Sequence, residues 1–146
     1  MKSLTMNLMF AAAALMVASS AASSAAIAAM APEVVKFEIP FAFQAAGKTM
    51  APGTYRVRPA NDKSYFTLSN VRSGETVYVN ALAPHDPEKE WKSQDGGVLQ
   101  LECGDGQCGL KQLWAGEGYP AVYISSPRGQ AGKSTHVALI RSVNSK

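Results

Sequence analysis

Alternation of apolar and polar residues with a period of two constrains this chain more than any other feature of its sequence. The first segment with this pattern is 34–43, where one face carries five apolar side chains: Val35, Phe37, Ile39, Phe41 and Phe43. Lys36 and Glu38 fall on the other face, and Pro40 favours an edge position or a bulge. Because successive side chains of a strand point to opposite faces of a sheet, the pattern predicts a strand with one buried face.

The same alternation continues along the chain, and turn residues interrupt it repeatedly. Further strands are predicted at 54–58, 64–69, 75–82, 98–103, 108–114, 121–125 and 137–142. In the second strand Tyr55 and Val57 face inward, and in the fourth Val77 and Val79 share a face. About eight short strands over one core predict an all-β fold, namely an antiparallel β-sandwich, with a small β-barrel as the alternative.

The first 28 residues have a different composition and predict a cleavable, helical signal peptide. Lys2 supplies the positive start, 8–18 is an uninterrupted apolar run, and Ala26-Ile27-Ala28 is a suitable cleavage site. A transmembrane helix is the alternative, but a span needs roughly 20 apolar residues and serines interrupt the run earlier. We therefore expect residues 1–28 to be removed and residues 29–146 to form a single β domain without a membrane span.

The charge pattern and the predicted signal peptide bear on partners and location. No cysteine stands directly after the apolar run, so lipid attachment is not expected, and the mature protein should be periplasmic or extracellular. Lys and Arg residues are scattered singly along the sequence, whereas nucleic-acid-binding proteins gather them on one segment or face. Nucleic acid is therefore not an expected partner.

Cys103 and Cys108 are the two cysteines of the chain and lie on the two strands of a predicted hairpin. Directly opposed residues of antiparallel strands are close enough for a bridge, and an exported protein meets oxidising conditions. The prediction is a disulfide, with free thiols or metal ligation as the alternatives.

The segment 83–97 is the longest predicted irregular stretch, and long loops in compact domains are often functional. It supplies the candidate binding residues Trp91, Asp86, Glu88 and Glu90, to which Tyr119 and Tyr123 are added as aromatic candidates. The alternative is a solvated connection in which Trp91 only covers the end of the core.

No pattern of ionisable residues indicates catalysis or a cofactor. His85 and His136 are far apart in the sequence, and neither has a second ligand at a metal-binding spacing. The alternating Asp86, Glu88 and Glu90 could hold calcium weakly if the loop were extended, but the spacing of an EF-hand is missing. We expect no metal site, no cofactor and no enzyme activity.

Residues 35–57 carry a set of motifs with a wider resemblance. They are Ile39-Pro40-Phe41 with Phe43, then Gly47-Lys48-Thr49, then Pro52-Gly53-Thr54-Tyr55. The chain resembles small secreted bacterial proteins of unknown function that share an I-P-F-x-F strand, a G-K-T turn and a P-A-G-T-Y-like turn. The resemblance implies a fold rather than an activity, and the chain departs from it at Ala42, where an acidic residue is common, and in its cysteine pair.

Three functions remain open from the sequence. The first is a non-catalytic exported domain that binds a protein, a glycan or an envelope component. The second is a small barrel that carries an apolar ligand, if Phe37, Phe41 and Phe43 line a cavity. The third is an enzyme, which would require His85 or His136 to approach a carboxylate or a serine.

Overall fold

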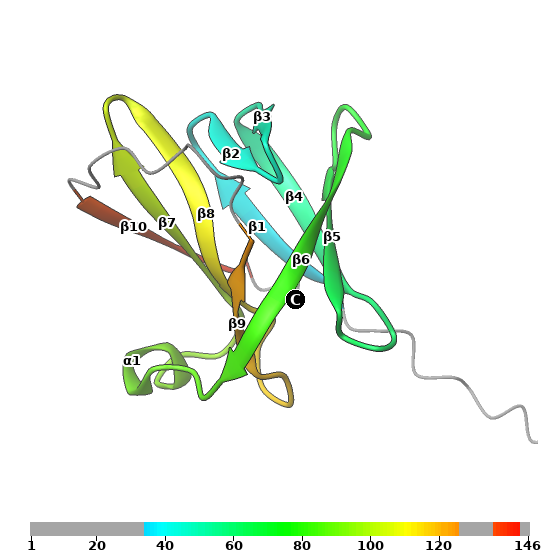
Figure 1. The fold of residues 1–146 in the computed structure, drawn as a ribbon, viewed down its shortest axis with the longest axis vertical. Helices are drawn as coiled ribbons and strands as arrows, with labels where there is room; N and C mark the ends of the chain where they lie inside the picture. The colour runs from blue at the N-terminus through cyan, green and yellow to red at the C-terminus, as the bar shows by residue number, and fades with distance from the viewer. Residues whose placement is uncertain (1–33, 126–135, 144–146) are drawn as a thin grey trace, which may run out of the picture.

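The computed structural model describes residues 34–125 and 136–143 (Figure 1). The predicted signal peptide, residues 1–28, lies outside the described residues. Within the described ranges the chain forms ten strands and one short helix, which confirms the predicted all-β class. No helix among these residues is long and apolar enough to cross a membrane.

Four antiparallel strands make the first layer of the fold, in the order β1-β4-β5-β6. Their bounds are Val35–Ile39, Gly53–Pro59, Tyr65–Asn70 and Thr76–His85. Continuous ladders join β1 to β4, β4 to β5 and β5 to β6. The strands β4, β5 and β6 follow one another in the sequence and therefore form a simple meander.

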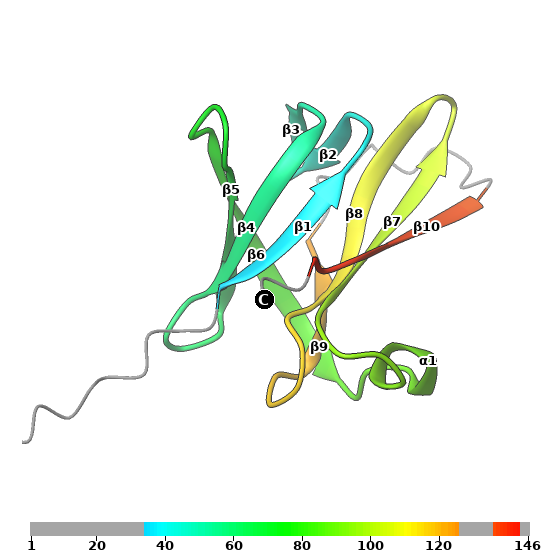
Figure 2. The same cartoon turned by 180° about the vertical axis from the view of Figure 1, so that it is seen from behind.

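The second layer begins at the far half of β6, which belongs to both layers (Figures 1 and 2). It continues through β9, β8, β7 and β10, all antiparallel, with bounds Ala121–Ile124, Gln107–Trp114, Val98–Gly104 and His136–Arg141. The register shifts between Ala81 and Pro84 of β6. Such an irregularity increases the local bend and twist of a strand, which fits the passage of β6 from one layer to the other.

A small hairpin of β2 (Phe43–Ala45) and β3 (Lys48–Met50) joins the second layer. Its contact with β8 is a parallel pair, Gln44 with Gly109. The sheet is therefore mixed, whereas the prediction was a purely antiparallel one. The predicted single strand 34–43 is in fact two strands, because β1 ends before Pro40. Proline has no backbone N–H to donate to a ladder.

The core lies between the two layers and contains the apolar faces predicted from the sequence. Phe37, Ile39, Phe43, Tyr55 and Val57 are almost completely buried in it. Val77, Val79, Leu101 and Leu113 pack in the same cluster, and Phe41 is partly buried against it. The sheet is not closed into a barrel, since no ladder of the described residues joins its edge strands β1 and β10, and the contact there is an isolated bridge between Phe37 and Ser142.

The motif Pro52-Gly53-Thr54-Tyr55 has a structural explanation. The fully buried Tyr55 donates its hydroxyl proton to the backbone oxygen of Ala51, which ties the ring to the turn before β4. At Gly53, φ is 154°, and a Cβ would lie 3.0 Å from the side-chain nitrogen Nδ2 of Asn70. These residues therefore build the core and its turns.

Segment 83–97 differs from the prediction of one long irregular loop. Residues Ala83 to His85 extend β6, and Lys89–Lys92 form the short helix α1. No side chain caps α1 at its start, and four residues are too few for a helix to be stable alone. The prediction is therefore right for residues 86–88 and 93–97, which belong to no strand or helix, and wrong for 83–85 and 89–92. The helical turn was missed because it depends on a tertiary contact of Trp91, described below.

The predicted disulfide between Cys103 and Cys108 is confirmed. The two residues are directly opposed in the β7–β8 ladder, with Cα atoms 4.0 Å apart. The bridge closes the tip of this hairpin, at the end of the second layer opposite to α1 (Figure 1).

Candidate binding site

The helix α1 packs on the outer face of the second layer. Val98 and Trp114 are paired in the β7–β8 ladder, and with Ala121 they form a small apolar cluster separate from the main core. Trp91, only 1% exposed, completes this cluster from α1. A second tie is the hydrogen bond from Nη2 of Arg141 to the backbone oxygen of Glu90, 3.1 Å long.

Trp114 also positions the loop that follows β8. Its indole Nε1 donates to the backbone oxygen of Tyr119 at 3.0 Å, and the Tyr119 amide donates to the oxygen of Gly116 at 3.2 Å. The Tyr119 ring receives the ammonium group of Lys63, 5.3 Å from its centroid. The loop 115–120 is therefore fixed from both sides.

The opposite wall is formed where the two ends of the described chain meet. Ser142 donates its backbone amide to Gly97 and accepts the Gly97 amide on its hydroxyl, at 3.0 and 2.8 Å. Val143 donates to the backbone oxygen of Lys36 at 2.8 Å. At Gly97 a Cβ would lie 2.6 Å from the backbone oxygen of Trp114, so only glycine fits between these segments.

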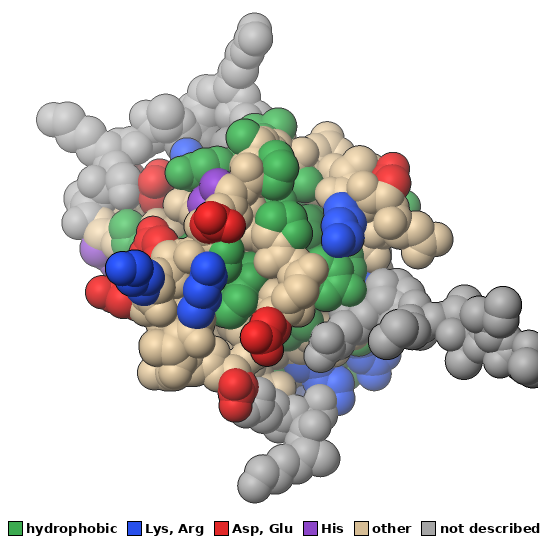
Figure 3. Space-filling model, turned by 90° about the horizontal axis from the view of Figure 1, so that it is seen from below, with side chains coloured by type: hydrophobic (Ala, Val, Ile, Leu, Met, Phe, Trp, Pro, Cys, Tyr) green, Lys and Arg blue, Asp and Glu red, His purple; other side chains and the backbone are tan. Residues whose placement is uncertain are grey.

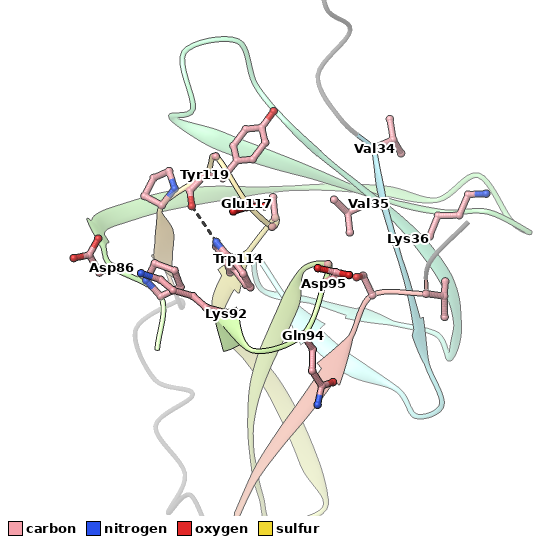
Figure 4. Close-up of a pocket in the computed structure, with 18 residues that line it drawn as sticks. Val34, Val35, Lys36, Asp86, Lys92, Gln94, Asp95, Trp114, Glu117 and Tyr119 are labelled. Atoms are coloured by element: carbon pink, nitrogen blue, oxygen red, sulfur yellow. Dashed lines mark hydrogen bonds between the residues drawn. The ribbon is translucent and has the colours of Figure 1, made fainter. Parts of the chain in front are cut away.

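These segments surround a wide pocket at one end of the molecule, which we call the end pocket (Figure 4). Its volume is about 1030 Å³, and it is lined from four stretches of chain: 34–36, parts of 86–96, 114–120 and 142–143. Figure 4 shows Trp114 between the side bearing Asp86 and Lys92 and the side bearing Val35 and Lys36. The volume is slightly above the range of about 300–1,000 Å³ that is typical of small-ligand pockets.

Five charged side chains line the end pocket, and none of them forms an ion pair with another described residue. They are Lys36, Asp86, Lys92, Asp95 and Glu117. Among the described residues, ion pairs join Lys48 to Glu75 and Lys111 to Glu102, which lie elsewhere. Figure 3, which views the molecule from below, shows acidic and basic groups interspersed around apolar ones. The end pocket can therefore offer both charge signs to a polar ligand.

The structure separates the predicted binding residues. Asp86 and Tyr119 line the end pocket. Trp91 is buried beside it as a support, and so cannot itself contact a ligand in this conformation. Glu88 and Glu90 are exposed but do not line the pocket. The row of three carboxylates that an extended loop would present is not formed, because α1 begins directly after Glu88.

Sequence reasoning missed several lining residues. Lys36 and Val143 reach the end pocket only through the pairing of chain segments that are distant in sequence. Glu117 lies in the Gly116-Glu117-Gly118 turn, and its neighbour Tyr119 was the one local signal for this loop.

His85 lies outside the end pocket. Its ring stacks on Tyr123 with centroids 4.5 Å apart, and Nε2 shares a hydrogen bond of 3.0 Å with Oε1 of Gln112. In the part of the chain that the structure describes, no three His, Cys, Asp or Glu side chains are arranged to hold a metal ion.

The motif residues of the resemblance do not line the end pocket, so they give no guide to its ligand. Comparisons of the chain with protein-family models, with curated proteins and with solved structures found no match.

Proposed function

We propose that this protein is a non-catalytic exported binding module and that the end pocket holds its ligand, a protein, glycan or other component of the cell envelope. The observation that carries the proposal is the joint position in one pocket of Trp114, Tyr119 and five charges that form no ion pair with other described residues. Unpaired charges beside an aromatic floor contribute little to stability, but they give a polar ligand both orientation and specificity.

Export is supported by two independent features. Residues 1–28 have the charge, apolar run and cleavage site of a signal peptide. The Cys103–Cys108 bridge is a form of cross-link that persists in oxidising compartments. We therefore place the working protein in the periplasm or outside the cell.

The packing argues for this function over an apolar-ligand carrier. Phe37 and Phe43 are at most 1% exposed within the core cluster, and the end pocket is lined by other residues. A carrier would need these rings to border a cavity. An enzyme is the less favoured reading because His85 is engaged by Gln112 and Tyr123, away from the end pocket.

Intrinsic fluorescence tests the proposal directly, because both tryptophans of the chain lie in or beside the end pocket. Soluble peptidoglycan fragments, neutral oligosaccharides and short peptides would be titrated separately into the protein. We expect one class to shift the emission saturably, and Tyr119→Ala to weaken that binding by about tenfold, the loss typical of one buried contact. Tyr123→Ala, an exposed tyrosine outside the pocket, is the control and should bind normally.

Three results would contradict the proposal. Saturable binding of an apolar dye, with no response to the polar panel, would favour the carrier. Turnover of any panel member that is lost in His85→Ala or His136→Ala would favour an enzyme. Equal weakening by Tyr119→Ala and Tyr123→Ala would remove the end pocket as the binding site.

A further inference from the structure

Strand pairing gathers three cations on the outer face of the first layer. Lys36 of β1 is directly opposed to Arg56 of β4, so their side chains leave the same face of the sheet. Arg58 follows two residues later on β4 and therefore shares that face. Arg56 and Arg58 are exposed, and Lys36 is half-buried.

None of these three cations belongs to an ion pair of the described chain, although Glu38, an exposed acid, lies on the same face of β1 two residues from Lys36. Like charges directly opposed across two strands destabilise a sheet. The arrangement therefore does not serve stability, which points to a ligand of opposite charge.

The neighbouring strands continue this face with hydroxyl groups and tyrosines. Arg58 is paired with Thr67 of β5, and Thr67 with Tyr78 of β6, so the three form one row across the sheet. Two strand spacings separate Arg58 from Tyr78, roughly 10 Å. Tyr78 is 62% exposed, and its ring meets Tyr65 edge to face with centroids 5.9 Å apart.

We propose that this cationic face, made of Lys36, Arg56, Arg58, Thr67, Tyr65 and Tyr78, binds an anionic polysaccharide. Each part matches a part of such a ligand. The guanidinium groups suit carboxylate or sulfate, because Arg presents paired donors to planar or oxygen-rich anions. The exposed Tyr78 offers an apolar ring with a polar end against which a sugar ring can stack. A strand-wide row suits an extended chain.

The same features make the other polyanions poorer fits. A membrane-binding surface combines cations with apolar side chains that enter the acyl region, whereas this row places a hydroxyl and a tyrosine beside them. Duplex nucleic acid is usually bound through many more phosphate contacts than three cations supply. Both remain as outcomes of the test below.

This surface is separate from the end pocket apart from Lys36, which borders both. Variants of Arg56 and Arg58 therefore test the cationic face without replacing a residue that lines the end pocket. Failure here would leave the proposed function untouched, and loss of pocket binding would leave this inference untouched.

The experiment measures binding of the mature protein to polygalacturonate, with dextran as the neutral polysaccharide. We expect binding to polygalacturonate at about 50 mM salt that weakens as salt screens the charges. The double variant Arg56→Gln with Arg58→Gln should bind about tenfold more weakly, and its salt dependence should be shallower because two ion contacts are lost. Tyr78→Ala should weaken binding about fivefold with the salt dependence unchanged.

The matched control is Lys89→Gln with Lys111→Gln, which removes two positive charges from α1 and β8 and should bind as the parent does. Arg56→Lys with Arg58→Lys should recover most of the binding and shows that charge, not loss of fold, is the cause. The inference is overturned if polygalacturonate and dextran bind alike, or if the control weakens binding as much as the Arg56 and Arg58 variant. Preferential binding to phosphatidylglycerol vesicles or to DNA would also overturn it.

Discussion

Trp91 and Trp114 lie in the same apolar cluster, yet only one of their indole nitrogens has a hydrogen-bond partner. Nε1 of Trp114 donates to the backbone oxygen of Tyr119, whereas Nε1 of Trp91 is buried without an acceptor among the described residues. The same substitution at the two positions would therefore break a hydrogen bond at Trp114 but none at Trp91.

Replacing each tryptophan by phenylalanine should separate these consequences. Trp91→Phe and Trp114→Phe remove the same atoms, but only the second deprives Tyr119 of its donor. We expect the Trp114 variant to lose about 1 kcal/mol more of the free energy of unfolding, the net value of one hydrogen bond. Urea unfolding, monitored by circular dichroism, measures this difference in the free energy of unfolding. Equal losses would mean that the indole of Trp91 is also hydrogen-bonded in solution.

Gly97→Ala should be among the more damaging single substitutions in this chain. The added Cβ would meet the backbone oxygen of Trp114 at 2.6 Å and the Phe37 ring at 2.9 Å. Overpacking of this kind typically costs about 1–3 kcal/mol, and we expect the upper end because one obstacle is backbone. Gly109→Ala is the control, since no atom lies within 4 Å of its new Cβ. Thermal unfolding of both variants tests this prediction. An unchanged melting temperature of Gly97→Ala would show that the backbone in the wall of the end pocket can shift to accept the added Cβ.

The alternation of apolar residues predicted most of the strands, because a strand with one buried face needs an apolar residue at every second position. It located β4, β5, β7 and β8 and the inward positions Tyr55 and Val57. The helix α1 has only four residues and shows no such periodic pattern. Its turn depends on Trp91 reaching Val98 and Trp114, a contact between residues that only the folded sheet brings together.

The candidate site was predictable only where one local segment supplies it. Tyr119 lies in the loop after β8 and Asp86 directly after β6, each in a segment that the sequence predicted to be irregular, and both line the end pocket. Lys36 could not be foreseen there, because its place depends on the bond from Val143 near the other end of the chain. The cationic face has the same origin, since scattered charges become neighbours when β1 pairs with β4.

The Cys103–Cys108 bridge should contribute only modestly to stability. It closes a short loop, with a sequence separation of 5, and cross-links restrict the unfolded chain less when the loop is short. Replacing both cysteines by alanine should lower the free energy of unfolding by about 2 kcal/mol and keep the fold. Reductant should lower the melting temperature of the parent but not that of the variant. A variant that fails to fold would give the bridge a larger role than its loop length allows.

The turn between β4 and β5 should make stability depend on acid pH through Asp62. The Ser64 amide and hydroxyl donate to Oδ1 of Asp62 at 3.1 and 2.8 Å, and these bonds lower the pKa of the carboxyl below its usual 3.8. Because the folded pKa is the lower one, the stabilisation is present above the unfolded pKa and is lost as pH falls through the folded value. Asp62→Asn should therefore be less stable than the parent near neutral pH, and the two should converge in strong acid. Urea unfolding across the acid range measures this, with Asp105→Asn as the control, and a constant gap between parent and Asp62→Asn would show that the carboxylate charge is not involved.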